Sequence, residues 1–502
     1  MTDAIHSEST PSFFGRDFKY VSSVLRSCAL ALLVLATGVF ATAADQKSAS
    51  NPCNISSAEA AGLNHDLSTD LQTGNVYVAT IARILKEERF DVLDCLADHA
   101  RSGKERFSGG AWKLSTLYVG LTNPVQYPIV HATQQDWNVL LQRLQHWTVA
   151  RPNSITAPVA LALANSGFAY DARGESTADT VTESGWKLFE ERMTEANRIL
   201  EQASTLPTKC PEWYLAMLDV ARNRGWDATH SRALFEEASK FEPGYYYFAQ
   251  ALAYSLTPRW GGEAGGTEKF SQEVADRVGG DQGDILYFQI ASANYIVRGT
   301  EDDPKLSWER IVRGYEASEK QYGTSLSNLN RMAYLAMSFA GGDVVFANKA
   351  ITRIGEQWDK ETWGSKEYFD QVKQLAAEQG PRMAEIFAIE AAAKSNAQTP
   401  EGARYQIAFE KTYRELLRQC AITHGGTPDA FGSKFESLTK VGAKGTVEDM
   451  KISAMGPIAA CLDRELKSFQ QARATPFPPP PQTPYWIRLD LDWADYTPVA
   501  TK

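Results

Sequence analysis

The chain has 502 residues, of which 43% are hydrophobic and 22% are charged. This composition is typical of a folded soluble protein and excludes a wholly disordered, collagenous or multi-span membrane protein. Acidic residues outnumber basic ones by 61 to 51, so the net charge is −10. An acidic chain lacks the positive surface that binds phosphate backbones, and we therefore expect no nucleic-acid partner.

The N-terminal region carries an export pattern. Three basic residues precede an apolar run over residues 28–43, which ends in the small-x-small triplet Ala-Thr-Ala. The run has the length of a signal-peptide core. We therefore predict that residues 1–43 are a signal peptide cleaved before Ala44, with the mature protein periplasmic or secreted. The alternative is an uncleaved inner-membrane anchor with the bulk of the chain in the periplasm, the one route by which we expect contact with a membrane.

The next part of the chain changes from polar to helical. Residues 44–75 are rich in Ser, Ala and Asn, which predicts a linker. Over residues 76–400, apolar side chains recur at intervals of three and four, the spacing of amphipathic helices. Two such stripes are Trp137, Leu140, Leu144 and Trp147, and Trp186, Phe189, Met193, Ala196 and Leu200.

Part of this helical region repeats. Segments 196–218 and 231–252 align with Ala203 over Ala238, a spacing of 35 residues. A period near 34 with helix–turn–helix units is typical of tetratricopeptide repeats, which bury their apolar faces by stacking. We therefore predict a mainly α protein whose residues 76–400 form a tetratricopeptide-like helical array.

The region over residues 401–502 follows a different pattern and predicts a small α+β domain with an antiparallel sheet. The final segment alternates apolar and largely charged residues, so we expect the sheet to cover a core on one side. The expected elements are a helix over 405–420, strands over 434–441 and 445–452, a helix from Pro457, and a strand over 485–493.

Two family resemblances rest on short motifs. In the helical region these are Trp112-x-Leu114-x-x-x-Tyr118, Trp137 through Trp147, Pro152-x-Ser154, Ala172-Arg173-Gly174 and Pro258-Arg259-Trp260-Gly261-Gly262. With them, residues 80–300 resemble the uncharacterised bacterial family named domain of unknown function 4034. That family has a tetratricopeptide-like architecture and no established activity, so the resemblance implies a fold alone.

The C-terminal region also resembles a family. Its motifs are Gly445-x-Val447, the helix around Ala460-Cys461-Leu462, the proline run over 476–481, and the final alternating strand. Together they resemble the C-terminal domain of TonB-like energy transducers. A transducer has a Pro/Lys-rich spacer where this chain has a helical array, so we do not expect energy transduction. What the resemblance implies is an edge strand that accepts a partner's strand.

The cysteines suggest disulfide bonds in an oxidising compartment. Cys420 and Cys461 both lie on the inward stripes of helices in the small domain, and we predict that they pair. Cys53 and Cys95 are a second candidate pair, which would leave Cys210 free; the partners of these three stay open.

The search for chemical motifs yields few candidates. No His or Cys spacing fits a metal site, and no phosphate-binding loop or nucleophile elbow is present, so we expect no metal and no cofactor. Arg173 and Arg259 remain, the latter beside Trp260. Either arginine would anchor a carboxylate in the concave groove of the array, or bond helix-end carbonyls and stack on Trp260; we favour the structural role.

These observations lead to one expectation and one alternative. We expect an exported, non-enzymatic interaction or scaffold protein of the bacterial cell envelope. Its array would bind a protein or peptide partner, and its small domain would bind a second partner by strand addition. The alternative is an envelope hydrolase, whose catalytic residues need only be close in space.

Overall fold

The structure is a computed structural model that describes residues 53–71, 75–125, 132–174, 178–298, 306–338, 342–423, 434–453 and 457–492. The predicted signal peptide or anchor, residues 1–43, lies outside these ranges. Among the described residues, no helix combines the length and the apolar character that crossing a membrane requires.

The chain divides into two compact units, residues 1–374 and 375–502. Helix α17 (Lys366–Ala397) passes from one to the other, and the predicted boundary at residue 400 falls at the start of α18. The helices of the first unit are α1 (Ser57–Asn64), α2 (Val76–Lys86), α3 (Phe90–Gly103), α4 (Lys113–Thr122), α5 (Gln134–Ala150), α6 (Thr156–Arg173), α7 (Glu183–Ala203), α8 (Pro211–Asn223), α9 (Ala228–Phe241), α10 (Tyr247–Ser255), α11 (Gly266–Val278), α12 (Gly280–Arg298), α13 (Trp308–Tyr322), α14 (Leu326–Ser338), α15 (Val344–Ile354) and α16 (Lys360–Trp363). Short 3₁₀ helices lie between them: η1 (Leu67–Thr69), η2 (Ser108–Gly110), η3 (Ala178–Thr180) and η4 (Pro258–Trp260).

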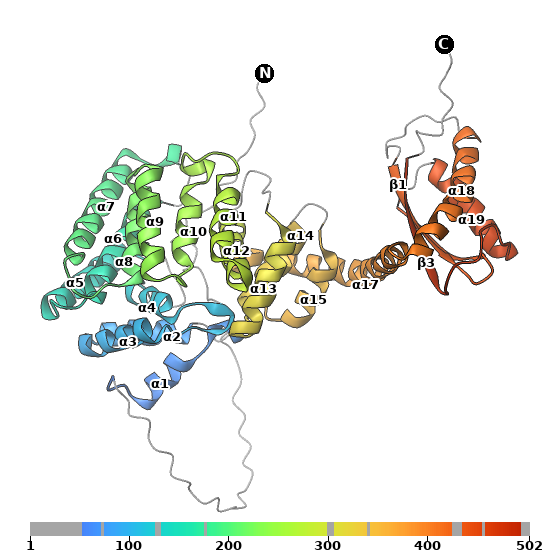
Figure 1. Cartoon of the computed structure of the whole chain (residues 1–502). Coiled ribbons are helices and arrows are strands. Elements are labelled where there is room, and N and C mark those ends of the chain that lie inside the picture. Colours follow the sequence, from blue (N-terminus) through green and yellow to red (C-terminus); the bar gives the residue numbers. More distant parts are fainter. Residues whose placement is uncertain are drawn as a thin grey trace, which may run out of the picture. The chain divides into compact units, whose positions relative to one another are not determined.

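The first unit is built from helices that pack on their neighbours in sequence, among them α6 on α7, α12 on α13 and α14 on α15 (Figure 1). One continuous apolar core extends from Leu63 to Ile290. The predicted stripe from Trp137 to Trp147 is buried in it, which confirms the mainly α prediction for this region. Trp186 differs from its stripe because it remains 39% exposed and packs edge-on against Phe189.

The segment predicted as a linker contains helix α1, which a disulfide next to it holds to the unit and a capping box stabilises from within. A disulfide joins Cys53 to Cys95 of α3 across 42 residues of chain, the second of the candidate pairs. The carboxylate of Glu59 in α1 accepts the N–H of Ser56 in a capping box. Polar, Ser-rich composition therefore did not prevent a helix here, because a cap and a cross-link stabilise it.

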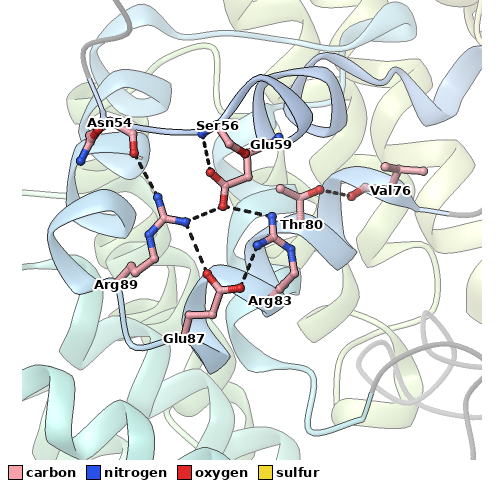
Figure 2. A network of polar contacts seen from close by, with 8 residues as sticks. All are labelled: Asn54, Ser56, Glu59, Val76, Thr80, Arg83, Glu87 and Arg89. Atoms are coloured by element: carbon pink, nitrogen blue, oxygen red, sulfur yellow. Dashed lines mark hydrogen bonds and ion pairs between the residues drawn. The ribbon is translucent and has the colours of Figure 1, made fainter.

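Glu59 also lies between two arginines (Figure 2). Arg89 Nη1 lies 2.5 Å and Arg83 Nη2 3.0 Å from the same carboxylate oxygen, and Glu87 bonds both guanidinium groups. Burial raises the pKa of Glu59, but the Ser56 N–H and the two guanidinium groups outweigh it and hold the pKa at about 2, against an ordinary 4.5.

We expect Glu59→Gln to lower the free energy of unfolding at pH 7 by about 1–2 kcal/mol, because partly exposed arginines lose a charged partner. A depressed folded-state pKa stabilises the protein above the unfolded pKa, and this stabilisation is lost as the pH falls through the folded value. The difference between wild type and variant should therefore shrink between pH 4.5 and about 2. Urea titrations at pH 7, 4 and 2.5 measure it; a difference independent of pH would contradict the assignment.

The second unit packs two helices on a three-stranded antiparallel sheet of order β2-β1-β3. Its apolar core includes the predicted helix stripe of Phe409, Tyr413 and Leu417, and the hydroxyl of Tyr413 bonds Ser437. The prediction of a small antiparallel sheet is confirmed. The elements are α18 (Pro400–Thr423), β1 (Lys434–Val441), β2 (Val447–Ile452), α19 (Pro457–Ala472) and β3 (Tyr485–Asp492).

The sheet is covered on more than the one side that the sequence predicts. Along β3, alternate residues beginning with Tyr485 face the main core, as expected. Leu438 points to the other face, where it packs with Ile389 and Ala393 of α17 and with Trp486. Part of the second face is therefore buried by the end of the long helix.

A disulfide joins Cys420 at the end of α18 to Cys461 in α19, as the sequence predicts. It closes a stretch of chain of 41 residues that includes β1 and β2. Both half-cystines are buried, at 1% and 8% exposure. The fifth cysteine of the described chain, Cys210, is free and buried.

Candidate binding site

The first unit contains a cavity of about 250 Å³, and its lining residues come from η1, Asn75 before α2, the loop at η2, α4, the start of α10, α12 and the start of α14. We call it the Tyr246–Arg331 pocket. Its lining is mostly hydroxyl, amide and aromatic side chains. The polar lining residues are Ser68, Asn75, Ser108, Thr116, Tyr246, Tyr247, Gln250, Gln289, Ser325, Ser327, Asn328 and Arg331.

A glycine carbonyl organises one wall of this pocket. The carbonyl of Gly109 accepts hydrogen bonds from Asn328 Nδ2 at 3.2 Å, from the Ser318 hydroxyl at 3.3 Å and from Gln289 Nε2 at 3.5 Å. The Gly109 N–H donates to the carbonyl of Gly323 at 3.1 Å. One residue thus fixes the side chains that three helices contribute.

Only glycine fits at this position. The φ of Gly109 is +75°, where L-residues with a side chain are strained. A Cβ there would overlap the side chain of Ser325 and lie 2.7 Å from Asn328 Nδ2.

We expect Gly109→Ala to lower the free energy of unfolding by about 2–3 kcal/mol, because backbone strain and overlap add. Gly261→Ala is the matched control, since its φ of +83° and ψ of 11° resemble those of Gly109 but no atom lies within 4 Å of an added Cβ. The control substitution should lower the free energy of unfolding by about 1 kcal/mol, because only backbone strain acts there. Equal losses in denaturant titrations of the two variants would show that the close packing at Gly109 is unimportant.

Two tyrosines form another part of the lining. The Tyr246 hydroxyl donates to the Tyr247 hydroxyl at 3.0 Å, and the Tyr247 oxygen also accepts the Trp112 N–H at 3.3 Å. Burial raises the pKa of Tyr246 well above its ordinary value and also raises the pKa of Tyr247. Both hydroxyls therefore stay protonated at neutral pH, and the O–H of Tyr247 is available as a hydrogen-bond donor.

The pocket is positively charged in an acidic protein. Arg331 on α14 is half-buried, and within the described chain its guanidinium makes no ion pair or hydrogen bond. No carboxylate, imidazole or thiol is among the lining residues. Asp66 lies beside the lining, but its oxygens accept bonds from Ser68 and from the N–H of Ser108.

A second arginine lies behind the tyrosines. The guanidinium of Arg106 is 4.0 Å from the ring centroid of Trp112 and donates to the carbonyls of Gly110 and Gly244 at 3.1 and 3.0 Å. Burial is the largest influence on the pKa of Tyr246, and the charges of Arg106 and Arg331 only partly oppose it. Both cations therefore contribute to a positive potential at the tyrosine wall.

A buried carboxyl group supports the tyrosine wall from the core. Glu212 is 2% exposed and accepts a hydrogen bond from the Tyr245 hydroxyl. The ring of Tyr245 packs against Trp112 at 4.8 Å and Tyr247 at 5.1 Å. Burial raises the pKa of Glu212 from 4.5 to about 7, which the bond from Tyr245 only partly opposes.

The free cysteine also lies in this buried region but is not in the pocket. Cys210 Sγ is 3.5 Å from the hydroxyl of Tyr118, and burial raises the pKa of the thiol. The thiol therefore stays protonated at neutral pH. It has the character of a packed core residue rather than of a nucleophile.

The arginines that the sequence singled out lie elsewhere. Arg173, at the end of α6, donates to the carbonyl of Gly174 and has its guanidinium 5.4 Å from the ring centroid of Trp186. Trp260, in η4, packs on Tyr254, and the guanidinium of Arg222 lies 5.1 Å from its ring centroid. Neither Arg173, Arg259 nor Trp260 lines the Tyr246–Arg331 pocket.

Two other places in the first unit have features of a site. An open groove of about 440 Å³ between α5, α6 and α7 is lined partly by Arg198, which is already paired with Glu195 at 2.7 Å. Cys53, Cys95 and His99 have potential metal-binding atoms within 4.8 Å of one another, but the disulfide already uses both sulfurs. Neither place offers an unused charged group.

No protein-family model, no curated protein and no solved structure matches this chain.

Proposed function

We propose that this chain is an exported, non-enzymatic interaction protein of the bacterial cell envelope, and that its helical unit binds a peptide segment in the Tyr246–Arg331 pocket. The observation that carries the proposal is the lining of the pocket. It combines aromatic, hydroxyl and amide groups with an unused guanidinium, and none of its hydroxyls has a carboxylate or imidazole in the lining to act as a base.

Two further features support the cellular location. The apolar run before Ala44 has the pattern of a signal peptide. The disulfides Cys53–Cys95 and Cys420–Cys461 are typical of proteins in an oxidising compartment. N-terminal sequencing of the protein from the envelope tests this part: a chain starting at Ala44 supports export with cleavage, and a full-length cytosolic chain contradicts it.

The proposal includes the C-terminal unit as a second binding module. The sheet order β2-β1-β3 leaves β2 and β3 as the outer strands of the described sheet. An outer strand can accept an extended segment of a partner through backbone hydrogen bonds. The resemblance to the TonB C-terminal domain supports this mode, as the resemblance to domain of unknown function 4034 supports the array.

Saturation-transfer NMR with a mixture of random tetrapeptides tests binding in the pocket. Ala293 lines the pocket, so Ala293→Val should weaken the signal and Ala293→Phe should abolish it as the cavity fills. Leu161→Phe, which fills the groove between α5, α6 and α7, is the matched control and should bind as wild type does. Circular dichroism checks that each variant is folded. Unchanged binding by both Ala293 variants would contradict the site, and cleavage of the peptides would identify a hydrolase instead.

A further inference from the structure

The Tyr246–Arg331 pocket collects hydrogen-bond donors that have no acceptor. Arg331 uses none of its five N–H groups within the described chain. The Tyr247 oxygen accepts two bonds, from Tyr246 and from the Trp112 N–H, while its own O–H donates to no described residue. Ser327, one helical turn before Arg331 on α14, likewise has an unbonded hydroxyl among the described residues.

These donors share one requirement. Each needs an acceptor, and the cationic one also needs a negative charge, because a partly buried guanidinium without a counter-ion is poorly solvated. Other arginines of the unit do have carboxylate partners: Arg277 lies 2.7 Å from Glu236, and Arg310 lies 2.8 Å from Asp284. Arg331 lacks such a partner among the described residues, so an anionic group of a ligand can take that place.

We infer that the pocket binds a carboxylate, and that its ligand is the C-terminal end of a peptide chain. This inference rests on the proposed function and specifies what the pocket recognises. A carboxylate matches the forked guanidinium of Arg331 with two parallel hydrogen bonds and accepts further bonds from the hydroxyls of Tyr247 and Ser327.

The size and charge of the pocket select a chain end. Its volume of about 250 Å³ is below the roughly 300–1,000 Å³ of pockets that take drug-sized ligands, so it admits the last residue or two of a peptide. A single guanidinium in the lining neutralises one carboxylate, whereas a doubly charged phosphate group would leave negative charge uncompensated. The rings of Tyr246 and Tyr247 provide apolar surface for the terminal side chain.

Three N-acetylated tetrapeptide mixtures test the inference on the purified protein by saturation-transfer and titration NMR. The first has free C-terminal carboxylates and contains no Asp or Glu. The second is the same mixture with amidated C-termini. The third is amidated but contains Asp and Glu. We expect the first mixture to bind at least about tenfold more tightly than the second, because a hydrogen-bonded charge pair is lost on amidation.

Variants of the arginine identify the group responsible. Arg331→Gln should weaken binding of the free acids roughly tenfold to a hundredfold and leave the amides unchanged, while Arg331→Lys should restore part of the affinity because it keeps the charge without the fork. Arg198→Gln removes a paired arginine of the other groove and should change nothing.

The outcomes separate this inference from the proposed function. If acids and amides bind equally and Arg331→Gln has no effect, carboxylate recognition is wrong while peptide binding in the pocket stands. If the third mixture binds as tightly as the first, the pocket takes a side-chain carboxylate, and recognition of the chain end is wrong. If none of the mixtures binds, peptide binding in the pocket itself is wrong.

Discussion

Removal of the Cys420–Cys461 disulfide is expected to lower the free energy of unfolding of the C-terminal unit by about 4 kcal/mol. The bond closes a loop of 41 residues. A cross-link across a loop of that length lowers the conformational entropy of the unfolded chain, and this is worth about 4 kcal/mol of stability. Loss of the bond should be severe because it ties α18 to α19 on the core side of the sheet. The measurement is hydrogen exchange of Cys420→Ala/Cys461→Ala, followed peptide by peptide in increasing urea.

The other disulfide provides a matched control. Cys53 and Cys95 close a similar length of 42 residues in the first unit, so Cys53→Ala/Cys95→Ala should increase exchange around α1 to α3 and leave β1 to β3 unchanged. If removing Cys420–Cys461 increased exchange throughout the chain, or nowhere, the assignment of the bond to the second unit's stability would be wrong.

Replacement of Glu212 by Gln is expected to stabilise the protein by about 3 kcal/mol above pH 7 and to have little effect at pH 4. Burial holds the folded-state pKa of Glu212 at about 7, whereas its ordinary value is 4.5. Between these values the unfolded chain ionises and the folded one does not, so wild-type stability falls as the pH rises from 4.5 to 7. Glutamine keeps an acceptor for Tyr245 but stays neutral at every pH.

Denaturant titrations of both proteins at pH 4, 5, 6, 7 and 8 give the difference directly. Glu237→Gln is the matched control, because Glu237 also accepts a tyrosine hydroxyl, that of Tyr214 at 2.8 Å, but is exposed. This control should show no gain that grows with pH. A Glu212→Gln variant that were less stable than wild type at pH 8 would mean that the buried carboxylate is ionised and stabilising.

Local patterns made much of the fold predictable. The final strand alternates residue by residue, and its buried positions are those with apolar side chains. The stripe of Phe409, Tyr413 and Leu417 predicts a buried helix face, and each of these residues is fully buried. Such patterns work because one buried face imposes a fixed spacing on the sequence.

Features set by distant contacts were not predictable. Helix α1 appeared as a linker because its stability depends on Cys95 of α3, Arg83 of α2 and Arg89 at the N-cap of α3. Arg222, which lies over the ring of Trp260, comes from α8, and no pattern near Trp260 points to it. A contact with a residue far away in the sequence does not affect the local spacing of apolar residues, so the local pattern does not reveal it.

The pocket was missed for the same reason. Gly109, Tyr246 and Arg331 come from three distant segments, and none belongs to a recognisable motif. Two signals were present: the pair Gly109-Gly110, and the run of tyrosines that includes Tyr246. In the sequence, the first pattern is also typical of a turn and the second of a helix start. Only the packed helices show that both line a pocket. The unused charge of Arg331 is visible only once the partners of the other arginines are known.

The buried thiol of Cys210 has a consequence for reversibility. While the first unit is folded, the thiol is enclosed and protonated, so it does not attack the Cys53–Cys95 disulfide. Unfolding returns the thiol to an ordinary pKa near 8.5, and its thiolate then exchanges with Cys53–Cys95. Heating at pH 8 should therefore scramble the disulfides and prevent refolding, whereas heating at pH 4 should not. Cys210 thus makes the survival of this protein after heat depend on how long it stays unfolded, rather than on its equilibrium stability.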